Sequence, residues 1–313
     1  MKDFALIGAA GHIARKHLRA IQETGNRLVA AVDPFDVMGR LDSFFPEAEF
    51  FLDCNSFERF VADRKKNNHP INYFSICSPN YLHAAHIQSA LRHQAFAICE
   101  KPLVLYPEEI ETIEKAEQES GCKVFNILQL RLHPAIAALR EKVKSGPAGQ
   151  VHDIDLTYIT PRGKWYFKSW KGDVDKSGGI AANIGIHFFD MLTWIFGEVQ
   201  RSTVHLRQPD KAAGLLELKT ARVRWFLSID FNDLPAEARQ KGLHTYRSIT
   251  MEGHEIEFSD GFSDLHTESY RQILSGQGFG LGEAAPCIRL AHQIRNTQVV
   301  GARGDYHPFF KQR

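Results

Sequence analysis

The chain has 313 residues, 43% of them hydrophobic and 24% charged, which is the length of about two ordinary globular domains. Lys and Arg number 38 against 37 Asp and Glu, and this balance disfavours a nucleic-acid-binding protein, because such domains are usually strongly basic. No stretch approaches the roughly 18 uninterrupted apolar residues of a membrane span. The five cysteines form no C-x-x-C pair, and we interpret them as reduced, buried thiols of a cytoplasmic protein.

Up to about residue 130, short apolar runs alternate with longer amphipathic ones. The pattern predicts strands at 4–7, 28–32, 73–77, 96–99 and 123–128, and helices at 12–24, 82–93 and 108–119. Continuous apolar strands separated by helices are typical of a parallel, doubly wound sheet. Four cysteines (Cys54, Cys77, Cys99 and Cys122) recur at the spacing of such strand–helix units. We therefore predict an α/β domain of the Rossmann type over residues 1–122.

The second half of the chain has a different pattern. Residues 153–160 and 222–230 alternate apolar and polar side chains, and 245–259 predicts a hairpin that turns at Glu252 and Gly253. A helix is expected at about 183–196. Strict alternation indicates a sheet with one packed and one more polar face. We predict an α+β domain with a largely antiparallel, open-faced sheet over residues 123–313.

A glycine-containing loop joins the first predicted strand to the first helix. Its small residues would let the backbone approach a pyrophosphate at the helix N-terminus, although Ala10 stands where G-x-G-x-x-G has its second glycine, and a plain tight turn is the alternative. Asp33 ends the second strand, where an acid accepts hydrogen bonds from the ribose of NAD and repels the 2′-phosphate of NADP. We predict NAD binding by Gly8, Ala10, Gly11, His12, Ile13 and Asp33.

Two polar motifs follow neighbouring predicted strands. Ser78-Pro79-Asn80, with His83, comes after the strand at 73–77, and Glu100-Lys101-Pro102 comes after the strand at 96–99. Open α/β sheets bind ligands at these carboxyl ends. Beside a cationic nicotinamide Lys101 would be shifted toward its neutral form, and it could take a hydroxyl proton as hydride leaves the carbon. The alternative is a surface lysine that reaches solvent.

These motifs, with Gln129-x-Arg131 and the segment Asn183-Ile184-Gly185-Ile186-His187-Phe188-Phe189-Asp190, resemble the Gfo/Idh/MocA family of sugar oxidoreductases. The resemblance covers nearly the whole chain. It implies that Lys101 and His187 are catalytic, and which of them is the immediate base stays open. Asp190 would orient the His187 imidazole or hold a sugar hydroxyl. The resemblance adds Ser78, Asn80, His83, Glu100, Lys101 and Gln129 to the NAD site, and Lys101, Arg131, Asn183, His187 and Asp190 to the substrate site.

A closer resemblance is to the WlbA/WbpB type within this family. Residues 4–11, 75–83, 126–131, 155–160 and 168–173 carry it. Such enzymes oxidise the 3-hydroxyl of UDP-N-acetyl-glucosaminuronate with NAD during the synthesis of bacterial surface polysaccharide. Residues 162–171 interleave four cations with four aromatic residues, which suits a uronate, a diphosphate and planar rings; a surface loop with solvated charges is the alternative. The expected substrate contacts in this loop are Arg162, Lys164, Tyr166 and Lys168.

Two other functions remain open. One is a dehydrogenase of a free sugar or inositol, which would need no diphosphate site. The other is a sensor that binds NAD without turnover, against which the presence of both Lys101 and His187 speaks. His83 and His86 form an H-x-x-H pair without a third ligand nearby, so we expect no metal. The resemblance implies a homo-oligomer, a dimer or tetramer formed through the second-domain sheet, and we expect no nucleic-acid or membrane partner.

Overall fold

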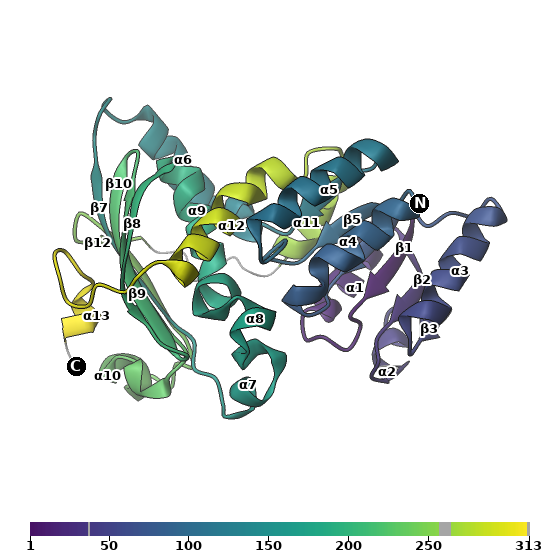
Figure 1. Ribbon diagram of the computed structural model, residues 1–313, viewed down its shortest axis with the longest axis horizontal. Helices are drawn as coiled ribbons and strands as arrows, with labels where there is room; N and C mark the ends of the chain where they lie inside the picture. The colour runs from purple at the N-terminus through teal and green to yellow at the C-terminus, as the bar shows by residue number, and fades with distance from the viewer. Residues whose placement is uncertain (37, 257–263, 312–313) are drawn as a thin grey trace. The chain divides into compact units, whose positions relative to one another are not determined.

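The computed structural model describes residues 1–36, 38–256 and 264–311, and it divides into two compact units (Figure 1). Among these residues, the first unit is 1–129 with 264–285, and the second is 130–256 with 286–311. The boundary expected after residue 122 lies inside the first unit. Helix α11 (Leu265–Leu274), which sequence analysis placed in the second domain, belongs to the first unit.

The sheet of the first unit has six parallel strands in the order β3-β2-β1-β4-β5-β6. This is the strand order of the Rossmann fold, and the parallel sheet predicted from the apolar runs is confirmed. The order reverses between β1 and β4, so a ligand crevice is expected at their carboxyl ends. The strands are β1 (Asp3–Ile7), β2 (Arg27–Val32), β3 (Glu49–Phe51), β4 (Tyr73–Ile76), β5 (Phe96–Cys99) and β6 (Val124–Asn126).

The helices of this unit have clear local start and stop signals. In α3 the Asp53 carboxylate accepts a hydrogen bond of 2.8 Å from the Ser56 amide, and α5 begins at Pro107 and ends before Gly121 (φ +70°). Cys54, the first residue of α3, is exposed, so the expectation of five buried thiols is wrong at this position. Besides α11, the helices are α1 (Ala14–Glu23), α2 (Met38–Leu41), α3 (Cys54–Lys66), η1 (Asn80–Leu82), α4 (His83–Arg92) and α5 (Pro107–Ser120).

One face of the first sheet carries a row of stacked aromatic rings. Phe4 on β1 stacks on Tyr73 on β4 at 4.9 Å between centroids, and Tyr73 stacks on Phe96 on β5 at 5.2 Å. Tyr270 of α11 stacks on Phe4 at 5.9 Å and is fully buried. Since α11 also packs against α1, the returning segment completes the core of this unit.

The second unit contains a six-stranded sheet in the order β12-β11-β7-β10-β9-β8. Neighbours are antiparallel except β7 and β10, which pair in parallel. The predicted hairpin is confirmed at Glu252 and Gly253, both with positive φ, while residues 257–259 of that prediction lie outside the described residues. The strands are β7 (His152–Ile159), β8 (Val199–Arg207), β9 (Lys211–Leu218), β10 (Ala221–Ser228), β11 (Tyr246–Met251) and β12 (His254–Glu255).

Helix α9 (Ile186–Phe196) packs on one face of this sheet, where Phe189 meets the buried Trp225 edge-on at 5.3 Å. The opposite face bears Phe226, on which His307 and Phe309 of the C-terminal segment pack at 5.8 and 5.7 Å. The remaining helices are η2 (Gln129–Leu132), α6 (Pro134–Ser145), α7 (Trp165–Lys168), η3 (Trp170–Gly172), α8 (Val174–Ser177), η4 (Ala181–Gly185), η5 (Phe231–Asp233), α10 (Ala236–Gln240), α12 (Leu281–Asn296) and α13 (Pro308–Lys311).

Among the described residues, the stretch Val174–Phe196 has the length and apolar composition of a membrane-crossing helix. It is a core element here, because 78% of its apolar window is buried inside the protein. Its interior is also irregular: η4 is a π-helical segment directly before α9.

Candidate active site

The loop after β1 passes close to the end of β4. Gly8 has φ +88°, and a Cβ atom there would lie 2.6 Å from the carbonyl carbon of Cys77 and from the Ser78 amide nitrogen. At Gly11 a Cβ would lie 3.2 Å from the Gly8 carbonyl oxygen. Because no side chain fits at Gly8, the backbone itself forms the floor of this loop, with His12 and Ile13 leading into α1.

Asp33 follows β2 and is only 6% exposed. Its Oδ2 accepts a hydrogen bond of 2.9 Å from the Ala10 amide, and its Oδ1 accepts one of 3.0 Å from the Phe35 amide. Each carboxylate oxygen keeps a second lone pair for another donor, such as a ribose hydroxyl. Ala10, the departure from the glycine pattern, thus contributes its amide to fixing the acidic group.

Arg40 of α2 was not among the residues predicted from the sequence. Its Nη1 atom donates to the carbonyl oxygens of Ala9 and Gly11, at 2.8 Å in both cases. The guanidinium therefore holds the loop from its carbonyl side. The tight glycine, the oriented carboxylate and the N-terminus of α1 fit NAD. No local signal marks Arg40, because its partners lie 29 and 31 residues earlier in the chain.

His83 joins the two strand-end motifs below the surface. Its Nδ1 lies 2.7 Å from the Pro102 carbonyl oxygen and its Nε2 lies 2.9 Å from the Ser78 carbonyl oxygen. The side chain is 1% exposed, and burial lowers its pKa. His86 instead bonds Ser78 Oγ at 2.8 Å, and burial lowers the pKa of His86 to about 4. Both His83 nitrogens thus face backbone carbonyl oxygens, and the nitrogen that carries the proton donates to one of the two turns.

The Glu100-Lys101-Pro102 turn is fixed by several elements. The Glu100 amide donates to the Ile76 carbonyl at 3.0 Å. Asn126 Nδ2 donates to the carbonyls of Cys99 and Glu100 at 2.9 and 3.2 Å. The Lys101 amide donates to Glu100 Oε2 at 3.2 Å. Lys101 therefore starts from a backbone held at the carboxyl end of β5, where sequence analysis placed it. Ser78 and Asn80 lie buried after β4, and Gln129 is half-buried after β6.

His187 and Asp190 lie on α9 in the second unit. A Cβ at Gly185, just before α9, would come within 2.6 Å of Leu227 Cδ1, so a larger residue would displace the helix start. Asp190 is 2% exposed and accepts two hydrogen bonds from Arg131, from Nε at 3.0 Å and from Nη2 at 2.7 Å. Burial raises the pKa of Asp190 while the Arg131 bonds oppose that rise. The structure thus joins two predicted substrate residues in one buried ion pair.

The segment 162–171 presents cations and aromatic rings together. Arg162, Lys164 and Lys168 are exposed, whereas Tyr166 is buried and its hydroxyl accepts a hydrogen bond of 2.8 Å from Asn183 Nδ2. Lys171, which was not among the predicted contacts, places Nζ 4.3 Å from the centroid of the Trp170 ring. Burial, with the charge of Arg162, lowers the pKa of Lys171. Tyr166 anchors the segment, and the cations around it suit an anionic ligand.

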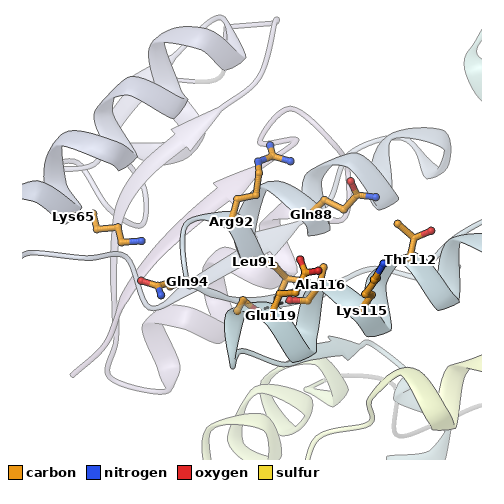
Figure 2. A pocket seen from close by; sticks show the side chains of 10 residues that line it. Lys65, Gln88, Leu91, Arg92, Gln94, Thr112, Lys115, Ala116 and Glu119 are labelled. Carbon is orange, nitrogen blue, oxygen red and sulfur yellow. Dashed lines mark hydrogen bonds between the residues drawn. The ribbon is translucent and has the colours of Figure 1, made fainter.

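A groove of about 470 Å³ lies elsewhere in the first unit, between α4 and α5 (Figure 2). Its lining comes from the last turns of both helices, including Arg92 and Lys115, together with Lys65 at the end of α3. Since α4 begins at the carboxyl edge of the sheet, its last turns lie toward the amino edge. The groove is therefore separate from the strand ends that carry the predicted NAD residues.

The strand order and the glycine loop of the first unit define an NAD-binding Rossmann domain. The second unit, with its mostly antiparallel sheet and packed helices, is an α/β domain. The chain belongs to the Gfo/Idh/MocA oxidoreductase family. The sequence model of the family's NAD-binding Rossmann fold matches residues 2–127, and that of its C-terminal alpha/beta domain matches residues 140–243.

Among solved structures, the chain is similar to the WlbA (WbpB) dehydrogenase from Thermus thermophilus, with 51% identity, a TM-score of 0.95, and coverage of 99% of this chain and 100% of that one. That enzyme was solved with NAD and UDP-GlcNAcA, and with NAD and alpha-ketoglutarate. The WlbA dehydrogenase from Bordetella pertussis shares the fold, with 17% identity, a TM-score of 0.77, and coverage of 97% of this chain and 98% of that one.

Curated relatives match over shorter stretches. Inositol 2-dehydrogenase from Rhizobium meliloti is 28% identical over 62% of this chain and 55% of its own length. The putative oxidoreductase YteT from Bacillus subtilis is 30% identical over 37% of this chain and 28% of its own length. The chain therefore matches about half or less of the length of these relatives.

Proposed function

We propose that this protein is an NAD-dependent dehydrogenase that oxidises the 3-hydroxyl of UDP-GlcNAcA (UDP-N-acetyl-glucosaminuronate) to a ketone. The observation that carries the proposal is the 51% identity, along 99% of the chain, to a dehydrogenase solved with NAD and UDP-GlcNAcA. The oriented Asp33 and the fixed Lys101 turn support it. The inositol dehydrogenase likeness, at 28% identity over part of the chain, is weaker support for the alternative substrate.

Lys101 and His187 have the proposed proton-transfer roles. When bound, NAD supplies the acceptor for the hydride that leaves the sugar carbon. The hydroxyl proton then passes to Lys101 Nζ or to an imidazole nitrogen of His187. A backbone held by Asn126 and Glu100 orients the lysine, and a closely packed helix start orients the histidine. Ser78, Asn80, Glu100 and Gln129 are proposed to surround the nicotinamide end of NAD.

The anionic groups of the substrate are proposed to meet the segment 162–171. UDP-GlcNAcA carries a diphosphate and a carboxylate, and cations suit both. Arg162, Lys164 and Lys168 are exposed, and alpha-ketoglutarate, the other ligand solved with the Thermus thermophilus enzyme, is also a carboxylate. Tyr166 and Asn183 are proposed to shape the same site. We further propose a cytoplasmic homo-oligomer that serves surface-polysaccharide synthesis.

Incubation of the purified protein with NAD and UDP-GlcNAcA tests the activity. NADH absorbance should rise, and NMR of the product should show a ketone at C3. Myo-inositol supplied in parallel should give no NADH. NADH formation from inositol and not from the nucleotide sugar would replace the proposal with the inositol dehydrogenase alternative. NAD binding without turnover of either substrate would favour the sensor.

A further inference from the structure

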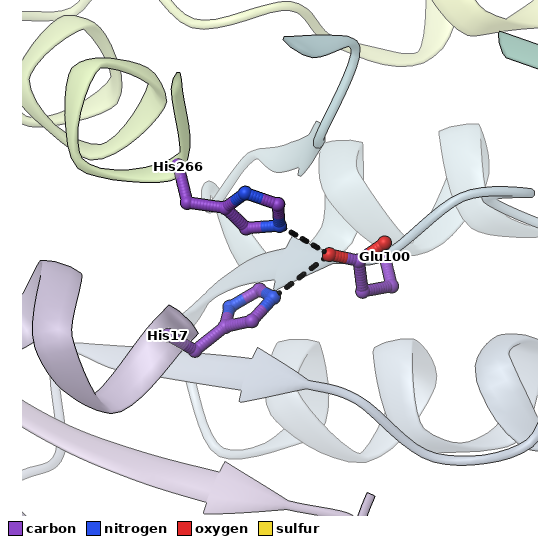
Figure 3. A group of neighbouring side chains, drawn as sticks. All are labelled: His17, Glu100 and His266. Carbon is purple, nitrogen blue, oxygen red and sulfur yellow. Dashed lines mark hydrogen bonds and ion pairs between the residues drawn. The ribbon is translucent and has the colours of Figure 1, made fainter. Parts of the chain in front are cut away.

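A buried hydrogen-bond network lies behind the Lys101 turn, within the first unit. His17 Nε2 on α1 lies 3.0 Å from Glu100 Oε1, and His266 Nε2 on α11 lies 2.9 Å from the same oxygen (Figure 3). The other carboxylate oxygen of Glu100 accepts the Lys101 amide at 3.2 Å. His17 is fully buried, while Glu100 and His266 are 7% and 5% exposed. Glu100 thus connects two helices to the backbone of the proposed catalytic lysine.

The chain of partners fixes the direction of these hydrogen bonds. An ionised carboxylate only accepts, so the Nε2 atoms of His17 and His266 donate to Glu100. Nδ1 of a neutral His17 then accepts from the Tyr270 hydroxyl, 2.7 Å away, and Ser75 Oγ donates to Tyr270 at 2.6 Å. Every member has a partner of the right kind with both histidines neutral.

Two histidines and a carboxylate are also a set of side chains that binds divalent metals. The distances favour direct hydrogen bonds instead, because 2.9 and 3.0 Å are ordinary donor–acceptor separations. An Nε2 atom that carries a proton for Glu100 also has no lone pair for a metal.

We propose that His17, His266 and Tyr270 are positioning residues: they keep Glu100 charged, and charged Glu100 holds the backbone of Lys101 in the orientation that proton transfer requires. The inference rests on the proposed role of Lys101. It assigns a task to α11, which reaches the first unit only after the chain has passed through the second.

The electrostatics of Glu100 agree with this assignment. Burial alone raises its pKa, but the hydrogen bonds from His17 and His266 reverse this and hold the pKa well below its ordinary value. Burial raises the pKa of Cys77, Cys99 and Tyr270 well above their usual ranges, so these neighbours stay neutral. The other titratable groups around Glu100 and its partners are Lys16 on α1, His83 on α4 and Lys101 in the same turn.

A matched pair of variants at His266 tests the proposal. His266→Leu removes one of the hydrogen bonds that lower the Glu100 pKa against the effect of burial. The Glu100 carboxyl should therefore take up a proton at a higher pH. We expect kcat of His266→Leu to fall about tenfold at pH 6 and to stay within about threefold of wild type at pH 9. His266→Gln, whose amide can donate to Glu100, should restore most of the loss at pH 6. NAD affinity should change less than kcat in both variants.

A purely structural role predicts a different result. It would lower kcat of His266→Leu by the same factor at every pH, and that outcome overturns the proposal, as does an equal loss in the glutamine variant. If His266→Leu does not fold, Tyr270→Phe provides the same test, with a smaller shift in the same direction, because it removes only the hydroxyl that fixes His17.

A direct measurement separates this inference from the proposed function. The Glu100 carboxyl can be titrated by ¹³C NMR in wild type and His266→Leu without any sugar, with Glu100→Gln used to assign the signal. We expect the titration to move to higher pH in His266→Leu even if UDP-GlcNAcA proves not to be the substrate. An unchanged titration, or one equivalent of metal bound to the wild-type protein and lost in His266→Leu, would contradict the network.

Discussion

Asp33 accepts the amides of Ala10 and Phe35, so the protein itself orients the carboxylate that is expected to meet the NAD ribose. The identity of this residue could be predicted from its place after the second strand. Its fixation could not, because it depends on how the loop around Ala10 folds back. The role of Arg40 could not be predicted either, because it binds two carbonyl oxygens of the loop and no local sequence pattern marks it.

Asp33→Asn should weaken NAD binding by about 1.5–3 kcal/mol, the size of a hydrogen bond to a charged group. An amide has one acceptor oxygen, so it cannot serve the Ala10 and Phe35 amides and a ribose together. Isothermal titration with NAD measures the loss, and Asp42→Asn, an exposed carboxylate at the end of α2, is the control. A wild-type protein that prefers NADP would contradict this role of Asp33.

Lys101→Met and His187→Asn should each reduce kcat about 10²- to 10⁴-fold, because a positioned proton acceptor contributes on that scale. His187 belongs to the second unit, so NAD affinity should survive in His187→Asn, whereas Lys101→Met should weaken NAD binding modestly. Steady-state kinetics with NAD titrations measure both quantities. Near-normal kcat in one variant removes that residue from the mechanism.

At the scale of elements, α9 is the part of the second unit that places His187. A π-helical segment precedes it, Gly185 packs against β10, and Asp190 is tied to Arg131. The apolar pattern predicted the helix, but neither the π segment nor the partner of Asp190. Those features depend on contacts with residues far away in the sequence, as Arg131 lies 59 residues from Asp190.

Gly185→Ala should destabilise the protein by about 1–3 kcal/mol, the usual range for overpacking a core. The added methyl would meet Leu227 Cδ1 at 2.6 Å and Phe189 Cε2 at 2.8 Å. Urea unfolding measures the change. Gly282→Ala on α12, where a Cβ would meet nothing within 4 Å, is the matched control and should be neutral or stabilising. Equal effects of the two substitutions would show that Leu227 and Phe189 leave room for a methyl group at Gly185.

Arg131→Leu should destabilise by about 3–5 kcal/mol, because it leaves the buried Asp190 carboxyl without the guanidinium that donates to both of its oxygens. The double variant Arg131→Leu with Asp190→Leu should recover part of that loss. Thermal unfolding of the variants checks this, with Lys144→Ala on the exposed Lys144–Glu141 pair as the control that changes little. If Lys144→Ala reduces stability as much as Arg131→Leu, burial is not the reason for the contribution of the Arg131–Asp190 pair.

For the whole molecule, local patterns predicted the parallel sheet and part of the second sheet, because buried parallel strands and half-buried strands leave different periodicities. Strands β3, β8 and β9 were not predicted. They did not predict that α11 returns to the first unit and supplies His266 and Tyr270 to the Glu100 network. The amphipathic spacing of a helix indicates that one of its faces is buried, but it does not indicate against which sheet the helix packs. Lys101 belongs to the first unit and His187 to the second.

The ratio of kcat/KM for UDP-GlcNAcA to that for UDP-N-acetylglucosamine, measured with NAD, tests the central claim most directly. The two sugars differ only by the carboxylate that the cations of segment 162–171 are proposed to recognise. Arg162, Lys164 and Lys168 are exposed, and a hydrogen bond to a charged group contributes about 1.5–3 kcal/mol, so we predict a preference of roughly tenfold to a hundredfold for UDP-GlcNAcA. Equal values for the two sugars would contradict the uronate site.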